Sequence, residues 1–320
     1  MKKYVINMLA KPEAITTSQM KSIANVDKAM EIYLKNSLTC LASLKIHNPD
    51  VECILFINFE LSAAWKEQFE NFSIKTIFLE FGNFKIDEEF NWGIVQYRYD
   101  VMQYLSNNLL DDDCVIMLDT DIVCVGNLKN AFTEIEHSVL LYDVQLTLIN
   151  ENREKIIKNY LRLFPNDTHC ELTVRGGEFI GANGFNLRRL FEECKKIMSM
   201  SSTIDSLEDF NDEHITSIAI YRNWNTIPVN NANPYIFRYW TGLRFYLAST
   251  NWYYNKVVLW HVPAEKNAGM IWLYKKLSKN KRLPSDKKIA RRFGFPSNKR
   301  SNMIPFIIAN FHKILKTLTK

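Results

Sequence analysis

The stretch Cys114–Leu128, CVIMLDTDIVCVGNL, decides the predicted fold of this chain. Its first part, Cys114–Leu118, is a continuous apolar run of the kind found in strands that are buried on both faces of a sheet. The run leads directly into Asp119 and Asp121, and a second apolar run, Ile122–Val125, follows at once. Aspartates are common in surface turns, but such turns are normally polar on both sides. The flanking apolar runs therefore favour two functional carboxylates at the end of a buried strand.

Strands and helices alternate along the chain before this stretch. Strand patterns alternate with helical ones, the strands at Lys3–Leu9, Glu52–Asn58 and Lys75–Glu80 and the helices at Val26–Ile46, Ser62–Phe72 and Gly93–Leu105. Later strands are predicted at Ser138–Tyr142, Glu178–Asn186 and Val257–His261, and later helices at Asn152–Leu163, Leu187–Met200 and Asp212–Tyr221. This alternation predicts an α/β fold with a mixed, mainly parallel central sheet flanked by helices.

The composition is that of a globular protein. The chain has 320 residues, of which 47% are hydrophobic and 13% aromatic, so it can bury a sizeable core. No apolar run approaches the roughly eighteen residues that a membrane-spanning helix needs. The six cysteines lie far apart and include no Cys-x-x-Cys pair, which argues against a zinc site. We expect buried, reduced thiols in a cytoplasmic protein.

Charge divides the chain into two regions. From Lys275 to the end there are fourteen Lys or Arg residues and one acid, Asp286, so this region carries +13 and leaves −8 for the remainder of a chain whose total is +5. We therefore expect one folded domain at residues 1–277 and a basic helical appendage at 278–320. Apolar residues recur in the appendage at helical spacing, at Ile304, Ile307, Ile308, Phe311, Leu315 and Leu318.

This basic, amphipathic pattern is typical of a helix that lies in an anionic membrane surface. An ordinary helix docked on the domain would show the same spacing, and that alternative stays open. Nucleic acid is not favoured as a partner, because no recognition motif accompanies the charge. The oligomeric state is not indicated by the sequence.

The two aspartates predict a metal site. In open α/β sheets, ligands bind beyond the carboxyl ends of the strands, and residues i and i+2 of an extended chain point the same way. Asp119 and Asp121 would therefore converge, and two carboxylates so close repel each other unless a cation lies between them. Carboxylate oxygens suit Mn²⁺ or Mg²⁺. Such an ion can neutralise a diphosphate, which points to a phosphate-bearing substrate.

A buried strand that ends in Asp-x-Asp, followed by an apolar run and Gly-Asn-Leu, resembles the GT-A nucleotide-sugar glycosyltransferases. The likeness is to glycosyltransferase family 8 and related bacterial enzymes of lipopolysaccharide and capsule synthesis, and it extends from about Tyr4 to Lys266. It implies a GT-A, Rossmann-like fold, a UDP-sugar donor, and Asp119 on the ribose and the metal with Asp121 on the metal. It also implies that His261, at the end of an apolar strand, is the third metal ligand.

The resemblance assigns further donor-binding residues. Arg98, in Gln-Tyr-Arg-Tyr, matches an arginine that contacts the donor, although a surface ion pair would also explain it. Lys266 matches a lysine that reaches the diphosphate, with its spacing displaced by one residue and with Ala264 in place of a glycine. In RGGEFIGAN, Glu178 and Asn183 could hydrogen-bond sugar hydroxyls, and the paired glycines would let the backbone approach a ligand. An ordinary strand after a glycine turn remains the alternative.

The triplet Asp212-Glu213-His214 stands where the family has Asp-Gln-Asp near the transferred sugar. The resemblance therefore implies that Asp212 or Glu213 contacts the sugar, although helix capping alone would explain Asp212. Together with Glu178, these two residues are our candidate catalytic residues. Tyr239 and Trp240 are candidates for an acceptor wall, since aromatic rings stack on sugar faces.

The interpretation is a metal-dependent glycosyltransferase that moves a hexose, galactose or glucose, from a UDP-sugar to a cell-surface glycan or lipid-linked acceptor, with retention by family likeness. It would act in the cytoplasm, on the inner face of the membrane. An alternative is a haloacid-dehalogenase-type phosphohydrolase with Asp119 as nucleophile, because such enzymes share the motif D-x-D-x-V. In those enzymes the motif usually follows the first strand of the fold, whereas three strand–helix units precede it here. A third alternative is a non-catalytic glycan-binding protein of the same fold.

Overall fold

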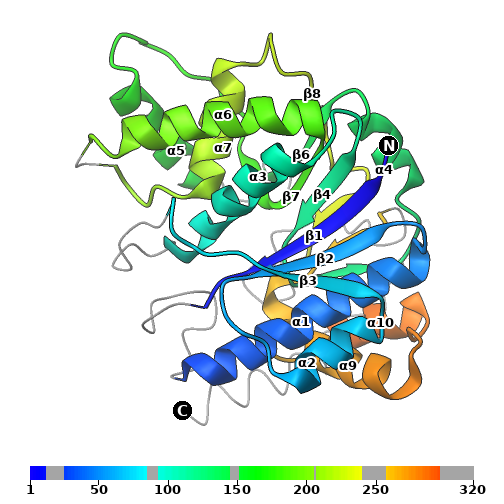
Figure 1. Cartoon of the computed structure of the whole chain (residues 1–320). Helices are drawn as coiled ribbons and strands as arrows, with labels where there is room; N and C mark the ends of the chain where they lie inside the picture. The colour runs from blue at the N-terminus through cyan, green and yellow to red at the C-terminus, as the bar shows by residue number, and fades with distance from the viewer. Residues whose placement is uncertain (12–24, 85–92, 145–150, 205–206, 240–256, 296–320) are drawn as a thin grey trace.

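The computed structural model describes residues 1–11, 25–84, 93–144, 151–204, 207–239 and 257–295, which form two sheets between helices (Figure 1). In this part of the chain the larger sheet has seven strands in the order β3-β2-β1-β4-β7-β6-β8. Their bounds are β1 (Lys3–Leu9), β2 (Glu52–Ile57), β3 (Ile74–Phe78), β4 (Cys114–Leu118), β6 (Val139–Asp143), β7 (Arg175–Asn183) and β8 (Val229–Asn231).

Neighbouring strands of the larger sheet run parallel except at β7, which is antiparallel to both β4 and β6. The predicted mixed, mainly parallel sheet is therefore confirmed. β4 lies at its centre between β1 and β7, and all five of its residues are buried. A strand covered on both faces has no solvent-facing side, which is why its sequence reads as an unbroken apolar run.

A smaller sheet begins where β4 ends. It has the order β5-β10-β9, with the bounds β5 (Ile122–Cys124), β9 (Ile236–Arg238) and β10 (Leu259–His261). The segment Asp119–Asp121 alone separates β4 from β5, so the chain passes from one sheet to the other at the two aspartates. Both apolar runs of the opening stretch are thereby accounted for, one in each sheet.

Helices cover both faces of the larger sheet (Figure 1). On one face lie α1 (Val26–His47), α2 (Ala63–Glu70), α9 (Gly269–Asn280) and α10 (Asp286–Phe293), and on the other α3 (Tyr97–Asn108), α5 (Glu151–Leu163), α6 (Gly184–Ser201) and α7 (Asp212–Arg222). The helix α4 (Lys129–Ile135) packs on β4, β6 and β7, and two short 3₁₀ turns are η1 (Gly93–Gln96) and η3 (Pro263–Glu265). The predicted flanking helices are confirmed.

Helix α1 shows why the elements pack as they do. It begins after Asn25, whose side chain accepts a hydrogen bond from the Lys28 amide and so satisfies a free helix donor. Leu38, Leu41 and Leu44 recur on one side and are at most 1% exposed, and the helix as a whole packs on β1, β2, β5 and α9. Burying each such leucine contributes about 1.5–3 kcal/mol. This apolar stripe holds α1 against both sheets.

The structure moves one predicted strand. The strand expected at Glu178–Asn186 runs instead from Arg175 to Asn183. It ends there because the Asn183 side chain accepts a hydrogen bond from the Asn186 amide and caps α6. The shift brings both glycines, Gly176 and Gly177, into the strand.

The described part of the basic appendage packs on the domain. The expected boundary after Leu277 falls inside α9, which contacts α1. In α10 and just beyond it, Ile289, Phe293 and Phe295 are at most 5% exposed, whereas the basic residues of α10 are exposed. The apolar stripe of α10 thus covers the domain, as in the docked-helix alternative. The stripe from Ile304 onward lies outside the described residues.

All six cysteines are buried and unpaired, as predicted. Among the described residues, no helix is both long and apolar enough to span a bilayer.

Candidate functional site

Backbone hydrogen bonds from both sheets hold the segment that carries the two aspartates. The Asp119 amide donates to the Glu178 carbonyl of β7 at 3.2 Å, and the Asp121 carbonyl accepts from the Val262 amide, just beyond β10, at 3.0 Å. The buried Asn7 side chain of β1 donates to the carbonyls of Leu118 and Asp119 at 2.9 and 3.3 Å. The turn is therefore fixed by groups from three strands, as a rigid site requires.

Asp119, Asp121 and His261 form a compact cluster at this point. Each offers one ligand atom, and these atoms all lie within 4.8 Å of one another. His261 Nε2 is 3.3 Å from Asp121 Oδ2 and 3.7 Å from Asp119 Oδ2. His261 and Asp121 are buried, while 37% of the Asp119 side chain is exposed. The cluster is thus closed on the protein side and open at Asp119.

The residues present fit a divalent cation. Asp121 Oδ2 and His261 Nε2 are both buried and lie 3.3 Å apart, so the two candidate ligand atoms face each other. Lys266 Nζ lies 3.0 Å from Asp121 Oδ2 and supplies positive charge there. Two carboxylates and one imidazole are ligands that Mn²⁺ accepts readily, and Mg²⁺ shares the oxygen preference.

The charges in the cluster shift one another's pKa values. Burial by itself would raise the pKa of Asp121, but Lys266 and His261 outweigh it and hold that pKa below its ordinary value. Burial by itself would lower the pKa of His261, but Asp121 and Glu178 raise it to about 9. Without a cation, the imidazolium and the Lys266 ammonium therefore balance the carboxylates.

Arg98 connects the open side of the cluster to α7. Its guanidinium pairs with Asp212, the first residue of α7, and lies 3.5 Å from Asp119 Oδ1. The Arg98 side chain is only 6% exposed, so the alternative of a surface ion pair is wrong. Helix α7 is capped by Asn211, which accepts hydrogen bonds from the amides of Glu213 and His214. Asp212 is therefore not the cap, and its carboxylate is engaged by Arg98.

The paired glycines of β7 make room for buried ion pairs. A Cβ atom on Gly177 would overlap the carboxylate of Asp212 and the guanidinium of Arg98. A Cβ atom on Gly176 would overlap the carboxylate of Glu178. The expectation that these glycines admit a ligand to the backbone is corrected, because protein side chains fill that space.

Glu178 lies behind the cluster and not on its open side. Its side chain has no exposed surface, and it forms a two-point ion pair with Arg238 of β9 at 2.5 and 2.6 Å. Glu178 Oε1 is also 3.2 Å from His261 Nδ1. Burial by itself would raise the pKa of Glu178, but Arg238 and His261 lower it to about 2. The expected contact between Glu178 and a sugar is wrong, because its carboxylate is fully enclosed.

Glu213 is the third member of this ion-pair network. Arg238 Nη2 lies 2.9 Å from Glu213 Oε1, and 18% of the Glu213 side chain is exposed. Burial raises the pKa of Glu213, against the opposing charge of Arg238. Of the candidate catalytic carboxylates, Asp212 and Glu213 are thus partly accessible, at 11% and 18%, and Glu178 is not.

Asn183 lies far from the cluster. It pairs with Cys114, the first residue of β4, whereas Asp119 follows the last. At about 3.3 Å per residue, the length of β4 puts them roughly 15 Å apart along the strand. Asn183 caps α6 and donates to the Glu136 carbonyl. The structure thus gives Asn183 a capping role at the end of β7 that is remote from the cluster, and donor binding by this residue stays a prediction.

Tyr239 is fully buried and stacks on Phe295, so the acceptor-wall prediction is wrong for this residue. Its neighbour Trp240 lies outside the described residues.

Two residues of the site were missed by sequence reasoning. Arg238 stands alone among aromatics in PYIFRYW, and Asn7 interrupts the apolar strand YVINML. A single polar residue inside an apolar strand signals a buried partner, since an unpaired polar group there is costly. Both residues fit this pattern, but the pattern does not identify the residue with which each of them pairs.

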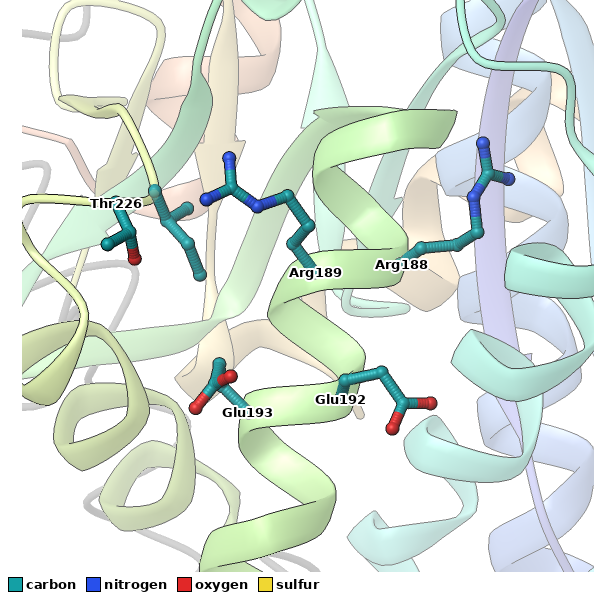
Figure 2. A pocket seen from close by; sticks show the side chains of 6 residues that line it. Arg188, Arg189, Glu192, Glu193 and Thr226 are labelled. Atoms are coloured by element: carbon teal, nitrogen blue, oxygen red, sulfur yellow. The ribbon is translucent and has the colours of Figure 1, made fainter.

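A separate pocket lies beside α6, the helix that follows β7. It is lined by Arg188, Arg189, Glu192, Glu193, Thr226 and Ile227 (Figure 2). In Figure 2, Arg189 points towards the Thr226 segment and Arg188 points away from it. Arg188 is engaged by Asp111 and by the carbonyls of Ser106 and Leu109. The pocket shares no residue with the cluster.

Comparisons with known proteins identify the fold. No family model matches the chain, and no curated protein matches it. Among solved structures, the galactosyltransferase LgtC in complex with donor and acceptor sugar analogues is 12% identical, with 89% of this chain and 99% of that one covered and a TM-score of 0.53. The structure of an active-site mutant of LgtC has a TM-score of 0.54, with the same identity and coverage.

Mouse xyloside xylosyltransferase 1 in its apo form is also 12% identical, with 82% of this chain and 97% of that one covered and a TM-score of 0.52. At these identities the likeness shows the fold alone, and the predicted GT-A fold is confirmed.

Proposed function

We propose that this protein is a metal-dependent glycosyltransferase. It moves a hexose, galactose or glucose, from a UDP-sugar to a hydroxyl of a cell-surface glycan or lipid-linked acceptor, with retention of configuration. The observation that carries the proposal is the cluster of Asp119, Asp121 and His261 at the carboxyl end of the central strand. The GT-A fold, which LgtC and the xylosyltransferase share, supports the same reaction class.

Asp119, Asp121 and His261 would hold Mn²⁺ or Mg²⁺. A bound divalent cation neutralises the charge that develops on a departing nucleoside diphosphate. Lys266 would approach the same phosphates, because its ammonium lies next to Asp121 and is already inside the site. A buried ammonium stabilises phosphate oxygens more strongly than one in water.

Arg98 and Asp212 would orient the sugar. Their ion pair adjoins Asp119, the exposed member of the cluster, so a donor that reaches the metal would pass beside it. Glu213, which is partly exposed, would contact the transferred sugar or the acceptor hydroxyl. Positioned groups of this kind hold the attacking hydroxyl near the anomeric carbon and remove part of the entropic barrier.

The experiment is a panel of UDP- and GDP-sugars with and without Mn²⁺, scored by calorimetry for binding and by chromatography for slow donor hydrolysis. We expect a UDP-hexose to bind and to turn over only with Mn²⁺, and Asp121→Ala to abolish both. Asp112→Asn, which changes an exposed acid just before β4, is the matched control and should behave as wild type. If no UDP-sugar binds, or if Asp121→Ala equals wild type, the proposal fails.

Two other outcomes would identify the rival functions. Hydrolysis of p-nitrophenyl phosphate that is lost in Asp119→Asn would identify a phosphohydrolase. Binding of a nucleotide sugar without hydrolysis or transfer to any acceptor would identify a non-catalytic glycan-binding protein.

We also propose that the protein acts in the cytoplasm, on the inner face of the membrane. The exposed basic side chains of α10, at Lys287, Lys288, Arg291 and Arg292, support contact with anionic lipid.

A further inference from the structure

We propose that Glu178, held by Arg238, is a positioning residue that fixes the ring of His261 so that Nε2 faces the metal site. The inference rests on the metal site of the proposed function and deepens it. Glu178 Oε1 lies 3.2 Å from His261 Nδ1, on the side of the ring opposite to Asp121. The ring is thereby held between a carboxylate behind it and two carboxylates in front of it.

The hydrogen bond determines which ring nitrogen can bind a cation. A glutamate in a two-point ion pair with arginine is ionised, so it can only accept hydrogen bonds. His261 Nδ1 must therefore donate, and in a neutral imidazole this leaves the lone pair on Nε2. Nε2 is the atom that lies 3.3 Å from Asp121 Oδ2. A carboxylate behind a ligating histidine also raises the basicity of the ring.

Arg238 in turn prevents Glu178 from turning away. Its guanidinium contacts both oxygens of Glu178 and one of Glu213, and it lies over the ring of Tyr142 at 5.9 Å. The Arg238 amide also donates to the Tyr142 hydroxyl. Both partners of the Glu178–Arg238 pair are at least nine-tenths buried, so neither can exchange its partner for water. The pair is a fixed support and not a substrate contact.

Gly176 is the residue that makes this arrangement possible. Its missing side chain leaves the space that the Glu178 carboxylate occupies, and a Cβ there would also press on Val144. Gly176→Ala would displace the carboxylate without removing any ionisable group. It therefore tests position separately from charge.

The experiment measures Mn²⁺ affinity by calorimetry in wild type, Glu178→Gln and the control Asp113→Asn. Asp113 is also a buried carboxylate, but it lies at the other end of β4, where it accepts from the amides of Lys2 and Leu110. We expect Glu178→Gln to weaken Mn²⁺ binding by about tenfold or more. Asp113→Asn should leave it unchanged. Nitrogen coupling in the electron spin-echo spectrum of bound Mn²⁺, expected in wild type from His261, should weaken in Glu178→Gln.

Gly176→Ala should weaken Mn²⁺ binding in the same way. If either variant fails to fold, long-range ¹H–¹⁵N spectra of wild type with Mg²⁺ give a test without substitution, with the proton expected on His261 Nδ1. A proton on Nε2 would overturn the inference. Unchanged Mn²⁺ affinity in a folded Glu178→Gln would overturn it alone and leave the proposed function standing. Wild-type affinity no tighter than that of Asp121→Ala would overturn the metal site and this inference together.

Discussion

Arg98 and Asp212, which are 114 residues apart in sequence, form a buried ion pair directly beside Gly177. Arg98 comes from α3 and Asp212 from the start of α7, so the pair joins two helices that lie on the same face of the larger sheet. Removing one partner of such a pair would leave an uncompensated buried charge, which is strongly destabilising. The absence of a side chain at residue 177 is therefore part of the site.

We predict that Gly177→Ala both destabilises the protein and weakens donor binding. The new Cβ would overlap the ion pair, and overpacking of this kind costs about 1–3 kcal/mol. Urea unfolding measures the stability change, and calorimetry with a UDP-sugar and Mn²⁺ measures binding.

Gly82→Ala is the matched control for this substitution. A Cβ on Gly82 would have no atom within 4 Å, so we expect a stability change within about 0.5 kcal/mol. Equal stability of the two variants would contradict the steric argument.

Lys266→Gln should weaken the binding of UDP but not of uridine. The ammonium of Lys266 would contact phosphate oxygens, which uridine lacks, so the loss should be about tenfold or more for UDP, or ~1.4 kcal/mol. Calorimetry in the presence of Mn²⁺ compares the two ligands. Lys276→Gln removes a lysine from a separate groove on α9 and should alter neither. An equal loss for UDP and uridine would show that Lys266 does not act on the diphosphate.

The contribution of His214 to the stability of the protein should fall between pH 7 and pH 5. Burial lowers the pKa of His214 to about 4, whereas the unfolded chain has the ordinary value of about 6.5. Between these values the unfolded state binds a proton that the folded state does not, so stability decreases as pH falls.

The expected contribution of His214 is about 2 kcal/mol between pH 7 and pH 5. His214→Gln keeps an acceptor for the Asn159 side chain, which lies 2.9 Å from His214 Nδ1, and removes the titration. Urea unfolding of both proteins at both pH values measures the difference. A pH dependence that is the same in His214→Gln as in wild type would contradict the assignment.

Truncation should separate membrane binding from folding. Deleting residues 296–320 removes the predicted amphipathic stripe and retains the buried Phe293 and Phe295, so we expect a folded protein that no longer sediments with anionic liposomes. Deleting residues 283–320 also removes Ile289 and both phenylalanines from the core and should lower stability by several times the ~1.5–3 kcal/mol of one buried side chain. Unchanged sedimentation after deletion of residues 296–320 would show that this stripe does not bind the membrane. Unchanged sedimentation after deletion of residues 283–320, which also removes the basic side chains of α10, would end the membrane proposal.

The larger elements could be predicted from local pattern alone. β1 and β4 were predicted to the residue, because both are short, mainly apolar segments, and in β4 burial on both faces leaves the apolar run unbroken. The three candidate metal ligands were also predicted, since Asp119 and Asp121 follow one strand and His261 ends another. A residue at the end of a strand can be identified from its position in the sequence, because the strand itself is recognisable there.

The partners of buried charges could not be predicted in this way. Glu178 and Asn183 lie in one strand and the sequence predicts one role for both, yet Glu178 contacts His261 and Asn183 caps a helix at the opposite end of the strand. Arg238 could not be identified from the sequence, because its partner Glu178 is 60 residues away and no local pattern indicates that the two residues pair.

The sequence by itself determined the alternating α/β order, the buried strand β4 and the two carboxylates at its end. These features follow from the periodicity of apolar residues, which involves only near neighbours along the chain and can therefore be seen in the sequence. Only the tertiary structure decided that Gly176 and Gly177 make room for ion pairs, that Glu178 is enclosed behind His261, and that Arg98 pairs with Asp212. Ion pairing depends on distance in space between residues that different elements bring together, and that distance is set by packing of the whole domain.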